Sequence, residues 1–171
     1  ACLVQNLALK KARAVAKLHP DDVVLAADTV VALDNHILGK PQDEEQAQKM
    51  LRMLSNRVHQ VYTGYCILKQ SRCEIGVSCT SVEFYPLSDE DIESYIATGE
   101  PFDKAGGYGI QSLGALLVRK IDGDFYNVVG LPIAEISRLL RTFGSRLHFH
   151  LGNGRNRWKR FAAETERCNS A

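Results

Sequence analysis

The sequence predicts a single domain that combines helices and strands, followed by a basic tail. Segments with apolar residues at helical spacing alternate with runs rich in β-branched residues, which is the pattern of a domain with both kinds of element. The 171 residues suffice for one domain with a sizeable core, and 45% are hydrophobic against 24% charged. After Gly144 the sequence becomes basic and loses its period, so we expect a domain over 1–144 and a disordered tail over 145–171.

The first two elements are a helix and a buried strand. Residues 3–18 carry apolar side chains at helical spacing, and Pro20 ends the predicted helix. The run 23–33 is rich in β-branched residues and is bounded by turn formers, which favours a strand buried on both faces. Asp43 is suited to cap a second helix over 43–54, whose first turn is acidic.

The second half of the domain is predicted to open with an antiparallel hairpin. Residues 59–69 and 73–85 alternate and are rich in Val, Tyr, Thr and Ile, with a polar turn between them. Ser88 with Asp91 resembles a capping box, which predicts the start of a third helix. Two further elements complete the domain: an apolar strand over 113–121 and a last helix over 133–143.

Composition excludes several classes of partner and suggests a compartment. A formal net charge of +1 points neither to nucleic acid nor to an anionic membrane. No apolar run approaches the roughly 20 residues that span a bilayer. The five cysteines form no C-x-x-C pair, and we interpret them as reduced thiols of a cytoplasmic protein. His59, alone before a strand, is interpreted as a surface or structural side chain.

Asp28 is the most informative residue of the first half. It lies between the apolar runs 23–27 and 30–33, where burial disfavours its charge unless a cation, a metal or hydrogen-bond donors hold it. It therefore either caps or pairs with a basic residue, or acts as a metal-binding or proton-accepting carboxylate, which is the interpretation we favour. The turn at 34–35 can bring Lys40 back towards it.

A second informative stretch is PFDKAGGYGIQ at 101–111, which holds an acid, a lysine, three glycines and a terminal amide. Lysines act as point charges on phosphate oxygens, and glycines let backbone N–H groups approach those oxygens. Carboxylates hold Mg²⁺ or Mn²⁺, or take a proton from an attacking water. The combination suits a polyphosphate with a divalent metal, and it is made by Lys11, Asp28, Lys40, Asp103 and Lys104.

These residues lie in motifs whose order resembles that of the Maf-like nucleoside triphosphate pyrophosphatases. The resemblance runs from about residue 3 to residue 143 and is highly specific because many motifs occur in the same order. The motifs are KA at 11–12, ADTVV at 27–31, LGKP at 38–41, VYTG at 61–64, TGEP at 98–101, DKAGGYGIQ at 103–111 and NVVGLP at 127–132.

The resemblance implies both a fold and a reaction. It implies an α/β fold with a mixed central sheet flanked by helices and a cleft between two lobes, as in the inosine triphosphate pyrophosphatase relatives. It implies hydrolysis of a nucleoside triphosphate to the monophosphate and pyrophosphate with Mg²⁺ or Mn²⁺. This reaction serves the house-cleaning of nucleotide pools. The form DKAGGYGIQ is that of the branch acting on dTTP and UTP. Expected partners are the nucleotide and a second copy in a homodimer, with no membrane and no specific nucleic acid.

The resemblance also implies site roles, residue by residue. Asp28 matches the proton acceptor, and Asp28 and Asp103 match metal-binding positions. Thr29 and Gln111 match positions tied to base selection, and a Gln amide offers both a donor and an acceptor to the O4/N3–H edge of thymine or uracil. Polar groups around the phosphates are expected at Lys11, Lys40, Asp103 and Lys104.

One feature of the family pattern is missing from this sequence. The family opens with a strand and a Ser-x-Ser-Pro-Arg-Arg loop, whereas this chain begins directly with the predicted helix and has no initiating Met. We therefore expect an N-terminally truncated chain. Two interpretations stay open at this point: an active pyrophosphatase domain, or a catalytically inactive relative that binds a nucleotide or a protein partner.

Overall fold

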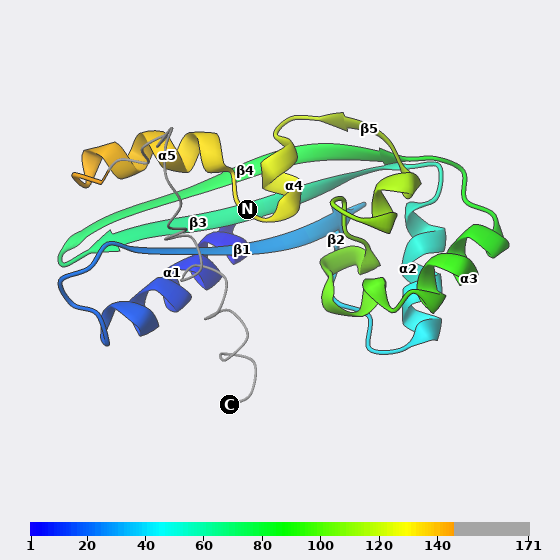
Figure 1. Ribbon diagram of the computed structural model, residues 1–171, viewed down its shortest axis with the longest axis horizontal. Coiled ribbons are helices and arrows are strands. Elements are labelled where there is room, and N and C mark those ends of the chain that lie inside the picture. The colour runs from blue at the N-terminus through cyan, green and yellow to red at the C-terminus, as the bar shows by residue number, and fades with distance from the viewer. Residues whose placement is uncertain (146–171) are drawn as a thin grey trace, which may run out of the picture.

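A computed structural model describes residues 1–145 of the chain, and its centre is a five-stranded sheet in the order β2-β1-β3-β4-β5. Every pairing between described strands is antiparallel. The long β3–β4 hairpin runs the length of the molecule (Figure 1). The strands are β1 (Val24–Leu33), β2 (His36–Leu38), β3 (Val58–Lys69), β4 (Arg72–Phe84) and β5 (Val118–Asp122).

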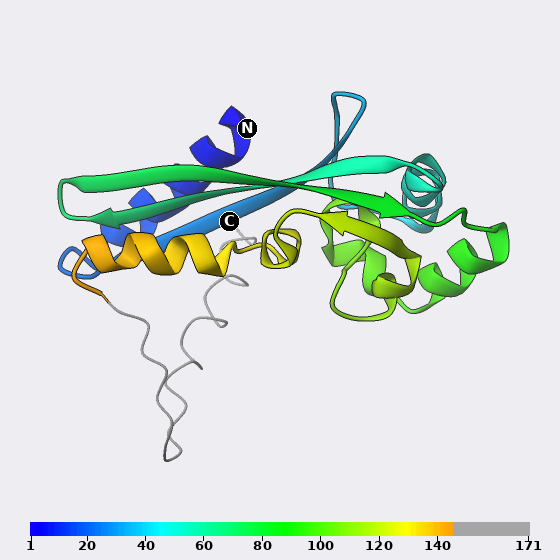
Figure 2. The same cartoon turned by 90° about the horizontal axis from the view of Figure 1, so that it is seen from above.

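Helices cover the sheet in three places. Helix α1 (Cys2–Ala16) lies on one face, while α4 (Phe125–Val129) and α5 (Ile133–Thr142) lie on the other (Figure 2). Helices α2 (Glu44–Leu54) and α3 (Asp89–Ala97) pack together at the far end of the hairpin (Figure 1). None of the described helices combines the length and the apolar character needed to cross a membrane.

The two faces of the hairpin receive their helices because of two glycines. A Cβ on Gly64 would lie 2.4 Å from the backbone carbon of Val4, so only glycine lets α1 approach β3 this closely. Opposite Tyr65 the partner is Gly76, and the ring lies over it. The Tyr65 hydroxyl then donates a 2.7 Å hydrogen bond to Glu135 of α5, which fixes that helix on the sheet.

Separate hydrophobic cores define two lobes. In the first lobe, alternate residues of β1 and β3 pack under α1 on one face and under α5 on the other. In the second lobe, the other ends of β1, β3 and β4 pack against α2 and α3 around Leu51, Leu54 and Phe84, which are fully buried. The fold class predicted from the sequence, an α/β arrangement with two lobes, is confirmed; its strand directions are antiparallel throughout the described sheet rather than mixed.

Most predicted elements are confirmed. Asp43 caps α2 by accepting a 2.8 Å hydrogen bond from the Gln46 amide, and Ser88 and Asp91 form the predicted capping box of α3. The strand predicted over 113–121 is wrong in its first half, because Leu113–Leu117 form a 3₁₀ helix before β5 begins. The predicted tail lies outside the described residues from residue 146 onward.

Candidate active site

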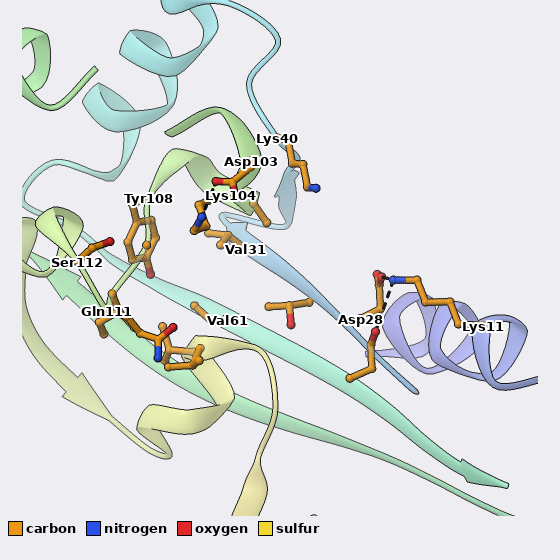
Figure 3. A pocket seen from close by; sticks show the side chains of 17 residues that line it. Lys11, Asp28, Val31, Lys40, Val61, Asp103, Lys104, Tyr108, Gln111 and Ser112 are labelled. Carbon is orange, nitrogen blue, oxygen red and sulfur yellow. Dashed lines mark hydrogen bonds and ion pairs between the residues drawn. The ribbon is translucent and has the colours of Figure 1, made fainter. Parts of the chain in front are cut away.

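A cavity of about 460 Å³ opens where the two lobes meet, beside the edge of β1 (Figure 3). Its lining comes from α1, from β1, from the corner after β2 and from the glycine-rich segment after α3. All seven residues that the sequence predicted as site residues line this one cavity: Lys11, Asp28, Thr29, Lys40, Asp103, Lys104 and Gln111. The structure therefore brings together groups that are up to 100 residues apart in the chain.

Asp28 forms an ion pair with Lys11, whose ammonium also lies 3.5 Å from the carbonyl oxygen of Ala27. The Lys11 side chain is 53% exposed and that of Asp28 is 19% exposed. Such a half-exposed lysine can move from the carboxylate to an incoming phosphate, because little burial energy holds it in place. Pairing with a basic residue, one of the two interpretations of Asp28, is thus observed, and it leaves the carboxylate facing the cavity.

Lys40 reaches the cavity because the chain reverses sharply after β1. Asp34 and Asn35 both adopt positive φ, 48° and 65°, which suits the two-residue turn between β1 and β2. The following corner is held by a 2.9 Å hydrogen bond from the Gly106 amide to the Gly39 carbonyl oxygen. The predicted return of Lys40 towards Asp28 is confirmed to the extent that both side chains line the same cavity.

Glycine is required at position 106, where the glycine-rich segment turns beneath the cavity. Gly106 has a φ of 73°, and a Cβ there would lie 2.9 Å from a methyl carbon of Val31. Within the segment, Lys104 pairs with Asp103 at 2.5 Å. The Asp103 side chain is largely exposed and that of Lys104 is partly exposed, so this pair can also open to a ligand.

Glu100 closes the glycine-rich segment at its base, a role that the sequence did not reveal. Its carboxylate accepts hydrogen bonds from the Ser112 hydroxyl and from the amides of Leu113 and Gly114, the latter two at 3.2 and 3.4 Å. Burial alone would raise the pKa of Glu100, but these hydrogen bonds outweigh it and lower the pKa. The bonds join the two ends of the segment that carries Lys104 and Gln111.

Thr29 begins a polar network that runs from the cavity into the core. Its hydroxyl lies 2.8 Å from that of Thr63, which donates a 2.9 Å hydrogen bond to the carbonyl oxygen of Asn127 in α4. The Asn127 amide donates to the Val61 carbonyl oxygen at 3.0 Å and to the Thr80 hydroxyl at 2.9 Å. Thr63 and Asn127 are fully buried, whereas Thr29 is partly exposed to the cavity.

Tyr108 lines the cavity and was not among the site residues predicted from the sequence. Its hydroxyl lies 2.7 Å from Nε2 of His59, and both rings pack edge to face with Phe84. The sequence predicted His59 to be either a surface or a structural side chain. Because His59 is fully buried, the second of these is confirmed. Burial lowers the pKa of His59 to about 4, which keeps the ring neutral near pH 7.

The donor set of the cavity suits a hard divalent cation only in company with a substrate. Among residues 1–145 no group of three or more His, Cys, Asp and Glu side chains gathers to hold a metal. Asp28 and Asp103 both line the cavity, and each is paired with a lysine. Because Mg²⁺ is commonly bound by one or two carboxylates plus substrate phosphates, the two aspartates fit such an ion when a triphosphate supplies further oxygens.

Comparison with known proteins shows which family this chain is similar to. The model of the Maf family, described as Maf-like protein, matches residues 1–143. A dTTP/UTP pyrophosphatase of Halalkalibacterium halodurans is 52% identical over 147 residues, which cover 86% of this chain and 77% of that protein. Proteins with the same name from Bacillus velezensis and Carboxydothermus hydrogenoformans are 56% and 53% identical, covering 82% and 83% of this chain and 74% and 77% of theirs.

Proposed function

The chain belongs to the Maf-like protein family, and on that basis we propose that it hydrolyses dTTP and UTP to the monophosphate and pyrophosphate. Relatives about half identical in sequence and covering most of the chain carry the name dTTP/UTP pyrophosphatase. The observation that supports the proposal in this chain is the single cavity. It collects three lysines, two aspartates and a glutamine amide that the sequence scatters over 100 residues.

The cavity offers separate chemistry for the two halves of a nucleotide. Lys11, Lys40 and Lys104 place three ammonium groups around it, which suits the oxygens of a triphosphate. Gln111 lies on the opposite side of the cavity from Lys11 and Asp28 (Figure 3). An amide there can donate to O4 and accept from N3–H of a uracil or thymine ring, which matches the pyrimidine named for the relatives.

Asp28 is proposed as the base that takes a proton from the attacking water. Release of pyrophosphate requires cleavage of the bridge between the α- and β-phosphates; in this proposal water attacks the α-phosphorus, and the bridging oxygen leaves with the pyrophosphate. When Lys11 moves to a phosphate oxygen, the Asp28 carboxylate becomes free to accept the proton of a water beside it. Lys40 and Lys104 line the cavity and are proposed to bind the phosphates of the nucleotide.

A divalent metal completes this proposal. The two aspartates offset two of the three lysine charges, so the side chains alone compensate little of the charge of a triphosphate. Asp28 and Asp103 would hold the Mg²⁺ or Mn²⁺, which would neutralise phosphate charge and orient the oxygens around it. The homodimer, the cytoplasmic location and the domain boundary at residue 144 remain proposals from the sequence.

The test measures which bond is cleaved and in which nucleotide. The purified protein is incubated with UTP, dTTP, CTP, ATP and GTP in Mg²⁺ or Mn²⁺, and monophosphate, pyrophosphate and orthophosphate are quantified. We expect pyrophosphate and monophosphate in equal amounts, fastest with UTP and dTTP, and none after chelation of the metal. Release of orthophosphate or a preference for purines contradicts the proposal. Binding of UTP without turnover identifies the inactive, nucleotide-binding relative instead.

A further inference from the structure

Two threonine hydroxyls and one backbone carbonyl group join the cavity to the core in a single row of hydrogen bonds. Thr29 faces the cavity from β1, Thr63 lies behind it on β3, and Asn127 lies behind Thr63 on α4. Thr63 and Asn127 have no solvent exposure, so water cannot exchange with the bonds between them. The direction of each proton in this row is therefore set by the protein.

The number of available protons determines which group is the donor in each hydrogen bond of the row. A threonine hydroxyl has one proton to donate, and a carbonyl oxygen can only accept. The 2.9 Å bond between Thr63 and the carbonyl oxygen of Asn127 thus uses the proton of Thr63. In the 2.8 Å bond between the two hydroxyls, Thr29 must then be the donor. Its own single proton points away from the cavity, and its oxygen lone pairs remain for a ligand.

Asn127 accepts the proton of Thr63 on its backbone carbonyl oxygen, and its side chain holds that residue in place. The side-chain amide nitrogen donates to the Val61 carbonyl oxygen at 3.0 Å and to the Thr80 hydroxyl at 2.9 Å. A flipped amide would place its oxygen against the Val61 carbonyl oxygen, which would lose this donor. The Thr80 hydroxyl is itself committed as a donor to the carbonyl oxygen of Asp124 at 3.0 Å. Every proton along the row is thereby assigned.

We propose that Thr63, held by Asn127, is a positioning residue that makes Thr29 an acceptor-only group in the cavity. The proposal rests on the proposed function and sharpens its specificity. An acceptor-only hydroxyl favours a nucleotide that presents an N–H or O–H group to it, and disfavours a bare phosphate oxygen or ring nitrogen. Two groups of UTP have this chemistry: the N3–H of the base, which cytosine lacks, and the hydroxyls of the sugar.

The experiment removes the Thr63 hydroxyl at nearly constant shape. Thr63→Val abolishes the acceptor for Thr29, whose hydroxyl can then donate to the ligand as well as accept; Thr63→Ser keeps the row and is the matched control. For wild type and both variants, kcat/KM is measured with UTP, CTP and 3′-deoxy-UTP, together with the melting temperature. We expect Thr63→Val to lower either the UTP-to-CTP ratio or the UTP-to-3′-deoxy-UTP ratio by about 3- to 10-fold, the worth of one hydrogen bond.

The two ratios identify which donor meets Thr29, because CTP changes the base and 3′-deoxy-UTP changes the sugar. Unchanged ratios in a Thr63→Val protein that melts cooperatively would overturn the proposal. If that variant does not fold, Thr29→Val removes the hydroxyl at the partly exposed end of the row, and unchanged ratios there overturn it equally. If wild type hydrolyses nothing, the proposed function fails separately, and the same ratios are taken from calorimetric binding of UTP, CTP and 3′-deoxy-UTP.

Discussion

Consecutive residues of β1 serve the cavity in opposite ways. Asp28 is paired with Lys11 of α1, a side chain that is half exposed, whereas Thr29 is bonded to a fully buried hydroxyl. The two side chains belong to opposite faces of the strand, and both reach the cavity because it lies at the edge of β1. One half of the site is thus built from charges that can move, and the other from hydrogen bonds that cannot.

This contrast has an energetic counterpart. An exposed ion pair contributes about 0–1 kcal/mol to stability, so either partner can leave for a ligand at little cost. Leaving a buried donor or acceptor without its partner costs about 1–3 kcal/mol. Substitutions among the exposed charges should therefore change catalysis and spare folding. Substitutions in the buried network should change both.

The largest effect is expected from Asp28→Asn. The amide keeps the shape of the carboxylate but cannot take a proton, so kcat should fall about 10²- to 10⁴-fold while UTP still binds. The melting temperature should stay within a few degrees, because Lys11, the partner of Asp28 in the ion pair, is half exposed. Asp89→Asn on α3 weakens the exposed ion pair with Arg52 of α2 and is the matched control, expected to leave kcat unchanged. Wild-type turnover in Asp28→Asn would refute the role of the base.

The buried half is tested by Asn127→Ala. Loss of the amide removes the hydrogen bond to the Val61 carbonyl oxygen and one of the two hydrogen bonds that the Thr80 hydroxyl accepts, in a dry site. We expect the free energy of unfolding to fall by about 2–4 kcal/mol in urea titrations, with the slope against urea unchanged. Asn35→Gly alters an exposed asparagine in a turn and should not destabilise the fold. A loss below about 1 kcal/mol would mean that water or relaxation satisfies the network.

Sequence reasoning reached the exposed half of the site more fully than the buried half. Asp28 stood out because a charge between two apolar runs needs a partner, and the ordered motifs supplied Lys40, Lys104 and Gln111. Thr63 and Asn127 lie within the ordered motifs at 61–64 and 127–132, but no role was predicted for either. Threonine is an ordinary strand residue, and the role of the Thr63 hydroxyl depends on a partner 64 residues away. The short helix α4 that contains Asn127 was not predicted.

The errors in the fold have a related cause. Leu113–Leu117 is apolar and was predicted as strand, but Glu100 binds the amides of Leu113 and Gly114 and fixes a 3₁₀ helix. Hairpins and caps depend on neighbours in the sequence and were predicted well. Contacts that join distant segments through a single side chain leave no periodic pattern, so they could not be derived from one sequence.

Acid should destabilise the fold through His59, a buried polar side chain outside the network of Thr63 and Asn127. Its pKa is lowered from 6.5 to about 4 by burial, so between these values the unfolded chain binds a proton that the folded chain does not. The contribution of neutral His59 to the free energy of unfolding is present in full above the unfolded pKa. It is lost as the pH falls from 6.5 towards 4, by about 3 kcal/mol in all. His59→Gln should show a shallower loss over this range, whereas His36→Gln, at an exposed site, should follow wild type. Parallel curves for His59→Gln and wild type would contradict this assignment.

The smallest effect is expected from Lys40→Ala. This substitution tests one of the exposed charged side chains of the site separately from the buried network. Lys40 is exposed in the corner after β2 and lines the cavity, so removing it should weaken triphosphate binding without disturbing the core. Loss of one charge-assisted contact predicts a rise in KM of about tenfold with kcat little changed. Salt should reduce the difference, because the screening length falls from about 10 Å at 0.1 M to about 3 Å at 1 M and weakens the wild-type contact. Lys49→Ala, which removes an exposed lysine of α2 outside the cavity, controls for net charge. Equal KM values for Lys40→Ala and Lys49→Ala would show that the corner after β2 takes no part in holding phosphate, and that the movable charges of the site are confined to Lys11 and Lys104.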